Sequence, residues 1–331
     1  MDYVNFTARE NDDDRRIDRI ILKMVPQMNI SVVCANLRSG FIRLNGKKCT
    51  NSVRVSNGDI ISIEKHLFER FSSSLTAKKD FRENDFDLEK ATLFRNEHIL
   101  VLNKPCGMLV QKASKNEISL DQIVENDYRK RFFEGNSLSF HPGPMHRLDK
   151  GTSGIICFSQ SLKCARWFQN SMLDHKFKKT YIAICEGKLV EKQKWVDKIG
   201  NDFSKNDDGF YTGRITSKDD DESKIAITNA YPLSYGKVGN KDVTLVEFQI
   251  ETGRHHQIRL QSSAHGYPLF ADSAYSKGKS DKFFLHCIKL EIGDNEFSIP
   301  ASIYCPVGNE FKNAMKNFLI NYNVEDYNIL S

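Results

Sequence analysis

Four polar segments contain the side chains whose types and spacing could do chemistry. They read NKPCGMLVQ (103–111), HRLDKGTSG (146–154), KKTYIAICEG (178–187) and TGRHHQIRL (252–260). A loop aspartate is by itself most often a turn former, and a strand tyrosine is most often part of the core. Asp149, however, stands among basic and small residues, where a carboxylate could act as a nucleophile or as a base. Either role requires the carboxylate to be ionised and aimed, which a nearby positive group would favour.

Other common chemistries find no support in the sequence. It contains no GxxxxGK[ST] or GxGxxG segment for nucleotide phosphates, and GTSG (151–154) lacks the GxSxG spacing of a serine hydrolase. The eight cysteines include no CxxC pair, so the sequence predicts no metal site. We therefore expect neither a cofactor nor a metal.

The elements that must position these segments are mostly strands. ILVLNKP, GIICFSQ, KTYIAICEG, VTLVEFQIET and FFLHCIKLEI are β-rich runs, and residues 161–176 and 307–322 have the pattern of amphipathic helices. The charged segment 200–224 is expected to be a surface loop. The sequence thus predicts an α+β fold whose sheet is mixed and largely antiparallel, in a domain at 91–322 that contains the four polar segments.

The positive charge is concentrated near the N-terminus. The whole chain of 331 residues has a net charge of +5, but residues 15–65 hold ten Lys or Arg against three acidic residues. This segment predicts two helices, the second with a cap at Ser31 and a stop at Gly40, and a hairpin at Asn45-Gly46. A concentrated basic unit is the footprint of a polyanion-binding module, although a solvated basic face is the alternative.

Residues 14–66 resemble the RNA-binding domain typified by ribosomal protein S-four, through RxDxxI, a GxIxLNGK segment and VSNGDI. The polar segment 67–90 is expected to be a linker. The resemblance implies that RNA binds to a basic edge near the junction of the helices and the hairpin. Its expected residues are Arg38, Arg43, Lys47 and Lys48.

Residues 91–320 resemble the RluA-type pseudouridine synthases. The four polar segments match that family's motifs in order, as do PLFADSAY (268–275) and LHCIKL (285–290). The resemblance implies that uridine in RNA is isomerised to its carbon-linked isomer without a cofactor, and that the substrate is most often large-subunit ribosomal RNA. The family usually has glycine where this chain has Ala271 and Ser276, and alanine where it has Cys287.

The motifs also imply roles for individual residues. Asp149 falls on the catalytic aspartate, Arg259 on its positive partner and Tyr181 on a ring that stacks against uracil. Arg147 is expected to fill the space of the extruded base or to hold a phosphate. Contacts to the RNA backbone are expected from three further residues, Lys104, Arg254 and Gln257.

Three alternatives remain open at this point. The substrate could be transfer RNA, or the chain could be a ribosome-assembly factor that binds RNA without catalysis. A glycosidase is the third, but those enzymes generally use two facing carboxylates, whereas the motifs single out Asp149 alone. No apolar run approaches the ~20 residues that span a bilayer, and the N-terminal residues are acidic and polar. We therefore expect a cytoplasmic protein without a membrane segment, acting as a monomer.

Overall fold

The computed structural model describes residues 1–72, 86–112, 117–131, 137–200, 204–205, 211–216, 223–276 and 282–324. The chain divides into two compact units, and each is described by itself. The first comprises residues 1–88, 123–143 and 159–166. The second comprises residues 89–122, 144–158 and 167–331. Among the described residues, no helix is both long and apolar enough to cross a membrane.

The first unit is built on a three-stranded sheet in the order β1-β5-β3. Its elements up to residue 72 are β1 Tyr3–Thr7, η1 Glu10–Asp12, β2 Arg15–Arg16, α1 Ile17–Met24, α2 Ile30–Ser39, β3 Ile42–Leu44, β4 Arg54–Val55, β5 Ile60–Glu64 and α3 Lys65–Ser72. Strand β1 lies before the expected domain start at residue 14, yet it pairs with β5 at five register positions. Helix α3 occupies the beginning of the expected linker, of which residues 73–85 lie outside the described residues.

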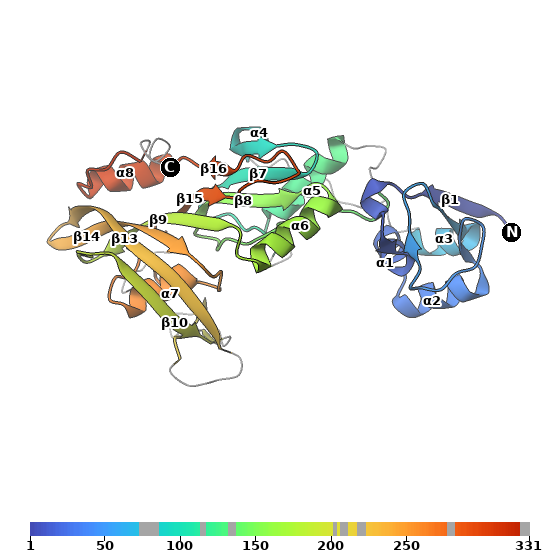
Figure 1. Ribbon diagram of the computed structural model, residues 1–331, viewed down its shortest axis with the longest axis horizontal. Helices are drawn as coiled ribbons and strands as arrows, with labels where there is room; N and C mark the ends of the chain where they lie inside the picture. Colours follow the sequence, from blue (N-terminus) through green and yellow to red (C-terminus); the bar gives the residue numbers. More distant parts are fainter. Residues whose placement is uncertain are drawn as a thin grey trace. The chain divides into compact units, whose positions relative to one another are not determined.

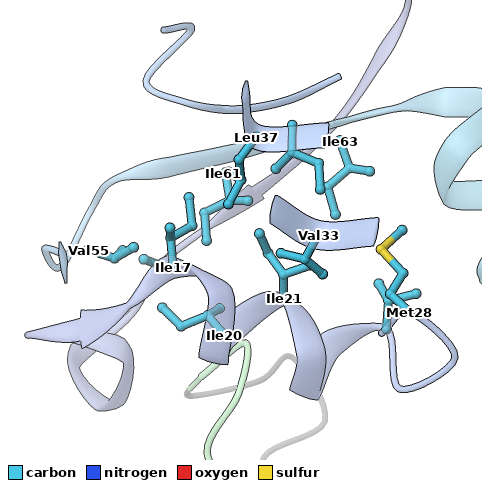
Figure 2. Packing of buried hydrophobic residues seen from close by; sticks show 12 residues of the cluster. Ile17, Ile20, Ile21, Met28, Val33, Leu37, Val55, Ile61 and Ile63 are labelled. Carbon is cyan, nitrogen blue, oxygen red and sulfur yellow. The ribbon is translucent and has the colours of Figure 1, made fainter. Parts of the chain in front are cut away.

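Apolar residues at helical spacing explain why α1 and α2 pack on this sheet. Ile17, Ile20 and Ile21 of α1 meet Val33 and Leu37 of α2 in one buried cluster, shown in Figure 2. The isoleucines of β5 close the cluster from the sheet side. Helix α2 stops at Gly40, as predicted. The φ of Gly40 is 87°. Its predicted cap at Ser31 is wrong, because Asn29 Oδ1 accepts the hydrogen bond from Val32 N at 2.9 Å.

The hairpin prediction is half correct. Asn45 and Gly46 both have positive φ, as a tight hairpin turn requires, but residues 48–50, directly after the turn, form no strand. Strand β3 pairs instead with β5. The reason is burial: β5 brings Ile61 and Ile63 to the core, whereas the run after the turn begins with two lysines.

The first unit also includes a segment far along the chain. The Asp12 carboxylate is fully buried and accepts hydrogen bonds from Ser137 Oγ (2.6 Å), Leu138 N (2.8 Å) and the Ser139 hydroxyl (2.6 Å). Arg15 Nη1 donates to the same Ser139 hydroxyl at 2.7 Å. Residues 137–139 are therefore fixed to the N-terminal residues by charge-assisted hydrogen bonds.

The second unit is built on a nine-stranded sheet, and the predicted α+β class is confirmed. Eight strands follow the order β10-β13-β14-β9-β15-β8-β7-β6, and β16 pairs with β15. Wherever the register of two neighbouring strands in this sheet is defined, the pairing is antiparallel, except for β15 with β8. The remaining elements of the chain are α4 Leu88–Ala91, β6 Thr92–Arg95, β7 Ile99–Lys104, α5 Leu120–Arg131, β8 Ser153–Ser159, α6 Leu162–Leu173, β9 Lys178–Glu186, β10 Gln193–Ile199, β11 Ser204–Lys205, β12 Tyr211–Thr212, β13 Lys224–Val238, β14 Lys241–Ile250, α7 Gln257–Ala264, β15 Leu285–Glu291, β16 Ser302–Tyr304 and α8 Asn309–Asn317.

Two helices cover different parts of this sheet. Phe311 and Met315 of α8 pack on Ile182 of β9 and Leu245 of β14. Helix α7 lies against β10 and β13, as Figure 1 shows. The predicted strands and both predicted helices are present. The expected loop at 200–224 includes the short β11 and β12, but most of its residues lie outside the described ones.

Candidate active site

The loop that carries Asp149 ends where two parallel strands come into close contact. Gly154 of β8 pairs with Cys287 of β15 and has φ of 105°. A Cβ at Gly154 would lie 2.6 Å from Cys287 N, so only glycine fits between the strands. Ser153 Oγ and His286 Nδ1 are 2.9 Å apart, which adds a side-chain contact beside this pair. The residues after Asp149 thus anchor the loop to the centre of the sheet.

Lys104 fixes the same loop from the side of β7. Its Nζ donates hydrogen bonds to the carbonyls of Pro105 (3.0 Å), Met108 (2.8 Å) and Lys150 (3.0 Å). The side chain is fully buried, and burial lowers the pKa of its ammonium to about 8. All three of its hydrogens point to carbonyls, so Lys104 joins two loops of the site. The expected contact of Lys104 with the RNA backbone stays a prediction.

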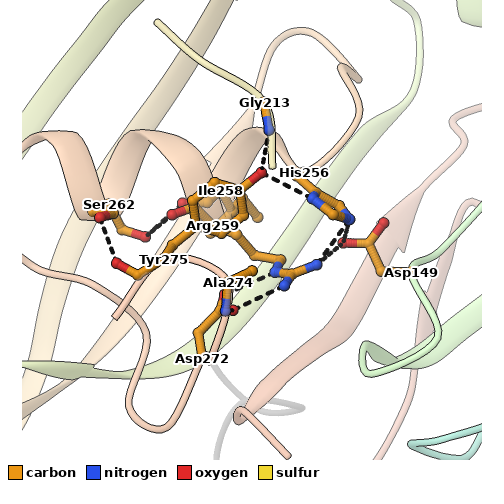
Figure 3. Close-up of polar contacts among 10 residues, drawn as sticks. Asp149, Gly213, His256, Ile258, Arg259, Ser262, Asp272, Ala274 and Tyr275 are labelled. Carbon is orange, nitrogen blue, oxygen red and sulfur yellow. Dashed lines mark hydrogen bonds and ion pairs between the residues drawn. The ribbon is translucent and has the colours of Figure 1, made fainter. Parts of the chain in front are cut away.

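An aspartate, an arginine and a second aspartate form the centre of the site (Figure 3). Arg259 of α7 donates from Nε and Nη2 to the two oxygens of Asp272, both at 2.8 Å. Its remaining nitrogen, Nη1, lies 3.4 Å from Asp149 Oδ2. The ion pair expected between Asp149 and Arg259 is present. Burial opposes the charge of Arg259, but the hydrogen bonds and attraction of Asp272 outweigh it and raise the pKa of the guanidinium.

His256 shares the free edge of this guanidinium. Its Nε2 lies 2.8 Å from Arg259 Nη1 and its Nδ1 lies 3.0 Å from the Tyr275 hydroxyl. Since arginine can only donate, Nε2 must accept, and the proton of the neutral ring lies on Nδ1. Burial lowers the pKa of His256 to about 3, which agrees with a neutral ring. The 3.7 Å approach of Nε2 to Asp149 is therefore not an ion pair, and the guanidinium between them holds both groups.

Tyr181 lies on β9 beside these groups. It pairs in register with Cys287 of β15, and its hydroxyl is within hydrogen-bonding reach of the Cys287 thiol. The residue is 6% exposed, and burial raises the pKa of its hydroxyl well above 10. The phenol therefore stays neutral, and its ring is available as an apolar surface.

These side chains border one open cavity of about 1430 Å³ in the second unit. Asp149, Tyr181 and Arg259 contribute to its lining, together with Arg147 and Arg254. Asp149 Oδ2 is held by Arg259, whereas Oδ1 has no hydrogen-bond partner among the described residues. One oxygen of the carboxylate is thus oriented and the other is available to a ligand.

The predicted RNA-contacting residues of this unit differ in exposure. The Arg147 side chain is exposed, and Arg254 is half-buried, with its Nε donating to the Ile225 carbonyl at 3.0 Å. Gln257 is 4% exposed, and its amide is used internally: it bonds Thr252, Thr228, the Ile227 carbonyl and Arg254 N. The expected contact of Gln257 with the RNA backbone stays a prediction, and in this structure the side chain is used within the fold. It holds the loop before α7 in place.

Three residues of the centre were not assigned roles from the sequence: His256, Asp272 and Tyr275. His256 was adjacent to an expected site residue, and the other two lie in the PLFADSAY segment. Ala271, which replaces the family's usual glycine, has φ of 64°, and His256 has φ of 53°. Positive φ at a non-glycine residue costs roughly 1–2 kcal/mol, so the backbone beside both Asp272 and Arg259 is held in strained geometry by its surroundings.

A set of metal-ligand types also occurs here. Donor atoms of Asp149, His255 and His256 lie within 4.8 Å of one another. Arg259 already donates to His256 Nε2 and faces Asp149 Oδ2, so a cation would compete with a fixed guanidinium for these lone pairs. The arrangement suits an oriented carboxylate better than a metal centre.

In the first unit, the four expected RNA-binding residues lie at the end of α2, on β3 and just after the turn. Arg38, Lys47 and Lys48 are exposed. Arg43 is half-buried, with its guanidinium 4.8 Å above the Tyr3 ring and its Nε donating to the Gly40 carbonyl at 3.0 Å. Three of the four cations are therefore available at the surface of this unit.

Comparison with known proteins places these features in context. The sequence matches the family described as RNA pseudouridylate synthase over residues 98–264, half of the chain. It is 29% identical over 293 residues to ribosomal large subunit pseudouridine synthase C of Rickettsia bellii, covering 85% of this chain and 91% of the relative. A protein of the same name from Buchnera aphidicola is 26% identical over 329 residues, covering 96% and 97%.

A solved structure shows the same fold. Human RNA Pseudouridylate Synthase Domain Containing 1 aligns with a TM-score of 0.57 at 20% identity, covering 75% of this chain and 96% of the human chain. This agreement supports the sheet architecture that brings the four polar segments together.

Proposed function

Because the chain belongs to the RNA pseudouridylate synthase family and is thus an enzyme that isomerises uridine in RNA, we propose that it acts on large-subunit ribosomal RNA with Asp149 as its catalytic carboxylate. The observation that carries the catalytic assignment is the asymmetry of Asp149. Arg259, which is held by Asp272, pairs with Oδ2; Asp149 lines the cavity, and its Oδ1 has no hydrogen-bond partner among the described residues. Figure 3 shows this carboxylate at the end of the chain of charged groups.

The reaction explains why such a carboxylate is needed. The N1–C1′ bond breaks and its electron pair stays on the uracil; the base then turns, C5 bonds to C1′, and the proton leaving C5 is balanced by one gained at N1. No electron acceptor or second substrate takes part. Asp149 is the group that attacks or removes a proton, and Arg259 keeps it ionised and directed.

The neighbouring residues fit the handling of an extruded base. Tyr181 provides a neutral ring next to Asp149 on which uracil can stack. Arg147 and Arg254 contribute cationic groups to the cavity lining, where the RNA backbone enters. Taking a base out of its stack costs a few kcal/mol, which contacts of this kind offset.

The substrate assignment rests on relatives and on charge. The relatives from Rickettsia and Buchnera are named for ribosomal large-subunit RNA. The first unit, with Arg38, Lys47 and Lys48 exposed, is proposed as an S-four-like domain that adds affinity for such RNA. The side chains of the site all come from one chain, which supports action as a monomer, and the substrate class favours the cytoplasm.

Pseudouridine mapping tests the proposal. Unmodified large-subunit ribosomal RNA and bulk transfer RNA are each incubated with wild type or Asp149→Ala, then treated with carbodiimide and read by reverse transcription. We expect new stops in ribosomal RNA with the wild type alone. Stops only in transfer RNA would overturn the substrate assignment, and stops with Asp149→Ala would overturn the role of the aspartate.

A further inference from the structure

Two lysines are buried in the second unit, and they differ in one respect. Lys104 is fully buried with its three ammonium hydrogens bonded to carbonyls. Lys179 is 9% exposed and has no hydrogen bond or ion pair with any described residue. A buried charge without a partner is costly, since hydration is lost and nothing replaces it. Such a group needs an explanation outside the fold.

Lys179 borders the cavity, next to the ring proposed to stack on uracil. It lies on β9 two residues before Tyr181, so both side chains lie on the same face of the sheet, about 7 Å apart along the strand. Both contribute to the cavity lining. A Cβ built on Gly253 would lie 3.8 Å from Lys179 Nζ, which places the ammonium beside the loop that leads into α7.

No acidic side chain among the described residues pairs with Lys179 or contributes to its electrostatics. The charged and titratable neighbours that influence it are the thiols of Cys157 and Cys287 and the imidazole of His146. Burial raises the pKa of Cys287 to about 12 and lowers the pKa of His146 to about 3, so both are neutral near pH 7. Burial lowers the pKa of the Lys179 ammonium itself, and a negatively charged ligand in the cavity would oppose this shift and hold the proton.

The depth of Lys179 in the cavity indicates which part of an RNA substrate it would meet, the backbone or the extruded base. The backbone of an RNA substrate must remain near the opening, where Arg147 is exposed and Arg254 half-buried. The extruded base enters furthest, and a side chain with 9% exposure next to Tyr181 is at the depth of the base. The uracil accepts the electron pair of the broken N1–C1′ bond, and its negative charge spreads onto the carbonyl oxygens O2 and O4.

We propose that the Lys179 ammonium stabilises this negative charge by donating to a carbonyl oxygen of the uracil, an inference that rests on the proposed use of the cavity as the uridine site. In this role the negative charge on the uracil holds the proton of Lys179 against the lowering of its pKa by burial, and no proton is transferred, so the balance of the reaction is unchanged. A preorganised donor of this kind acts more strongly on the charged transition state than on the neutral base, and removing one such donor lowers turnover about 100- to 1000-fold.

Lys178 offers a matched control. It is the preceding residue on β9, it is exposed, and its side chain lies on the opposite face of the strand. Lys178→Met and Lys179→Met each remove one lysine charge, at adjacent positions of the same strand. Only Lys179→Met changes the cavity lining.

The experiment uses large-subunit ribosomal RNA transcribed with 5-tritiated uridine, because the proton lost from C5 reports the reaction. With enzyme in excess, we expect Lys179→Met to slow tritium release about 100-fold, to change the Kd less than about threefold, and to leave the melting temperature equal or higher. Lys178→Met should behave as the wild type, and Lys179→Arg should recover part of the rate.

Each other outcome overturns the inference. Weaker binding with a smaller salt dependence and an unchanged rate would make Lys179 a phosphate contact. A lower melting temperature of Lys179→Met would make it a structural residue, and an unchanged rate would remove it from the reaction. No tritium release by the wild type would overturn the proposed substrate itself, whereas release by the wild type and Lys179→Met alike would overturn the role of Lys179 alone.

Discussion

Arg259 and Asp272 form two parallel hydrogen bonds of 2.8 Å, and Asp272 is fully buried. This fork-to-fork pairing sets the plane of the guanidinium. Only Nη1 is left over, and it faces both His256 Nε2 and Asp149 Oδ2. The direction of the proposed catalytic carboxylate thus depends on an aspartate that does not line the cavity.

Asp272→Asn is expected to damage both stability and turnover. Asparagine keeps the shape but leaves Arg259 buried with a neutral partner, which should lower the free energy of unfolding by about 3 kcal/mol. Misdirection of Asp149 should slow turnover about 100-fold. Denaturant unfolding and tritium release measure the two effects. Asp174→Asn, which breaks an exposed pair with Lys176, should cost less than about 1 kcal/mol; equal losses in both variants would contradict this account.

Lys104→Met distinguishes two roles for Lys104: joining two loops through its hydrogen bonds, and the contact with RNA that is expected from the sequence. The loss of three buried hydrogen bonds from a charged donor should destabilise the protein by about 3 kcal/mol, with the slope of log Kd against log salt unchanged. Arg147→Gln is the comparison. It should reduce that slope by the contribution of about one phosphate contact and leave the free energy of unfolding unaltered. A reduced slope in Lys104→Met would show Lys104 to be an RNA contact.

Stability should fall on acidification because three of the described histidines of the second unit are buried or half-buried. Burial lowers the pKa of His146 and His256 to about 3 and that of His286 to about 4, whereas an unfolded histidine titrates near 6.5. Below pH 6.5 the unfolded chain binds protons that the folded chain does not, so these groups reduce stability by up to about 4 kcal/mol per pH unit in total.

His286→Gln tests this dependence. Glutamine can keep the contacts with Ser153 and the Cys305 carbonyl but does not titrate. Between pH 6 and pH 5, the free energy of unfolding of this variant should decline less steeply than that of the wild type, by about 1.2 kcal/mol over that pH unit. Identical slopes would show that His286 protonates equally in both states.

The exposed cations of the first unit are expected to contribute to RNA affinity through counterion release. Replacing Arg38, Lys47 and Lys48 by glutamine should weaken binding and reduce the salt slope by about 2 to 3, while turnover at saturating enzyme is retained. Filter binding at several salt concentrations measures this. The control replaces three other exposed cations of the same unit, Arg19, Lys23 and Lys65. If both triple variants lose the same slope, the binding is not localised at the expected edge.

The sequence predicted the elements that have a strong local signal. The five apolar runs became strands, the Asn45-Gly46 turn formed, and Gly40 ended α2 because each depends on neighbouring residues. The pairing of Asp149 with Arg259 was also predicted, but from motif resemblance rather than from spacing. The predicted second strand of the hairpin did not form. Strand β3 pairs with β5 instead, and this pairing depends on core residues distant in sequence.

The internal hydrogen bonds of Lys104 and Gln257 were not predicted for a related reason. Polar residues in a polar segment suggest contact with a charged ligand, and sequence alone does not show that loop carbonyls will surround them. Asp272 was not assigned because its role depends on Arg259, 13 residues earlier, and on a turn with a strained Ala271. Such features arise only when the chain is folded.

The buried Asp12 has a consequence for the order in which the protein is made. Its hydrogen-bond donors are at residues 137–139, about 125 positions later in the chain. During synthesis from the N-terminus, the helices of the first unit emerge early, but this carboxylate stays without those donors until nearly half of the protein has been translated. The first unit should therefore complete its packing only while the strands of the second are already emerging from the ribosome.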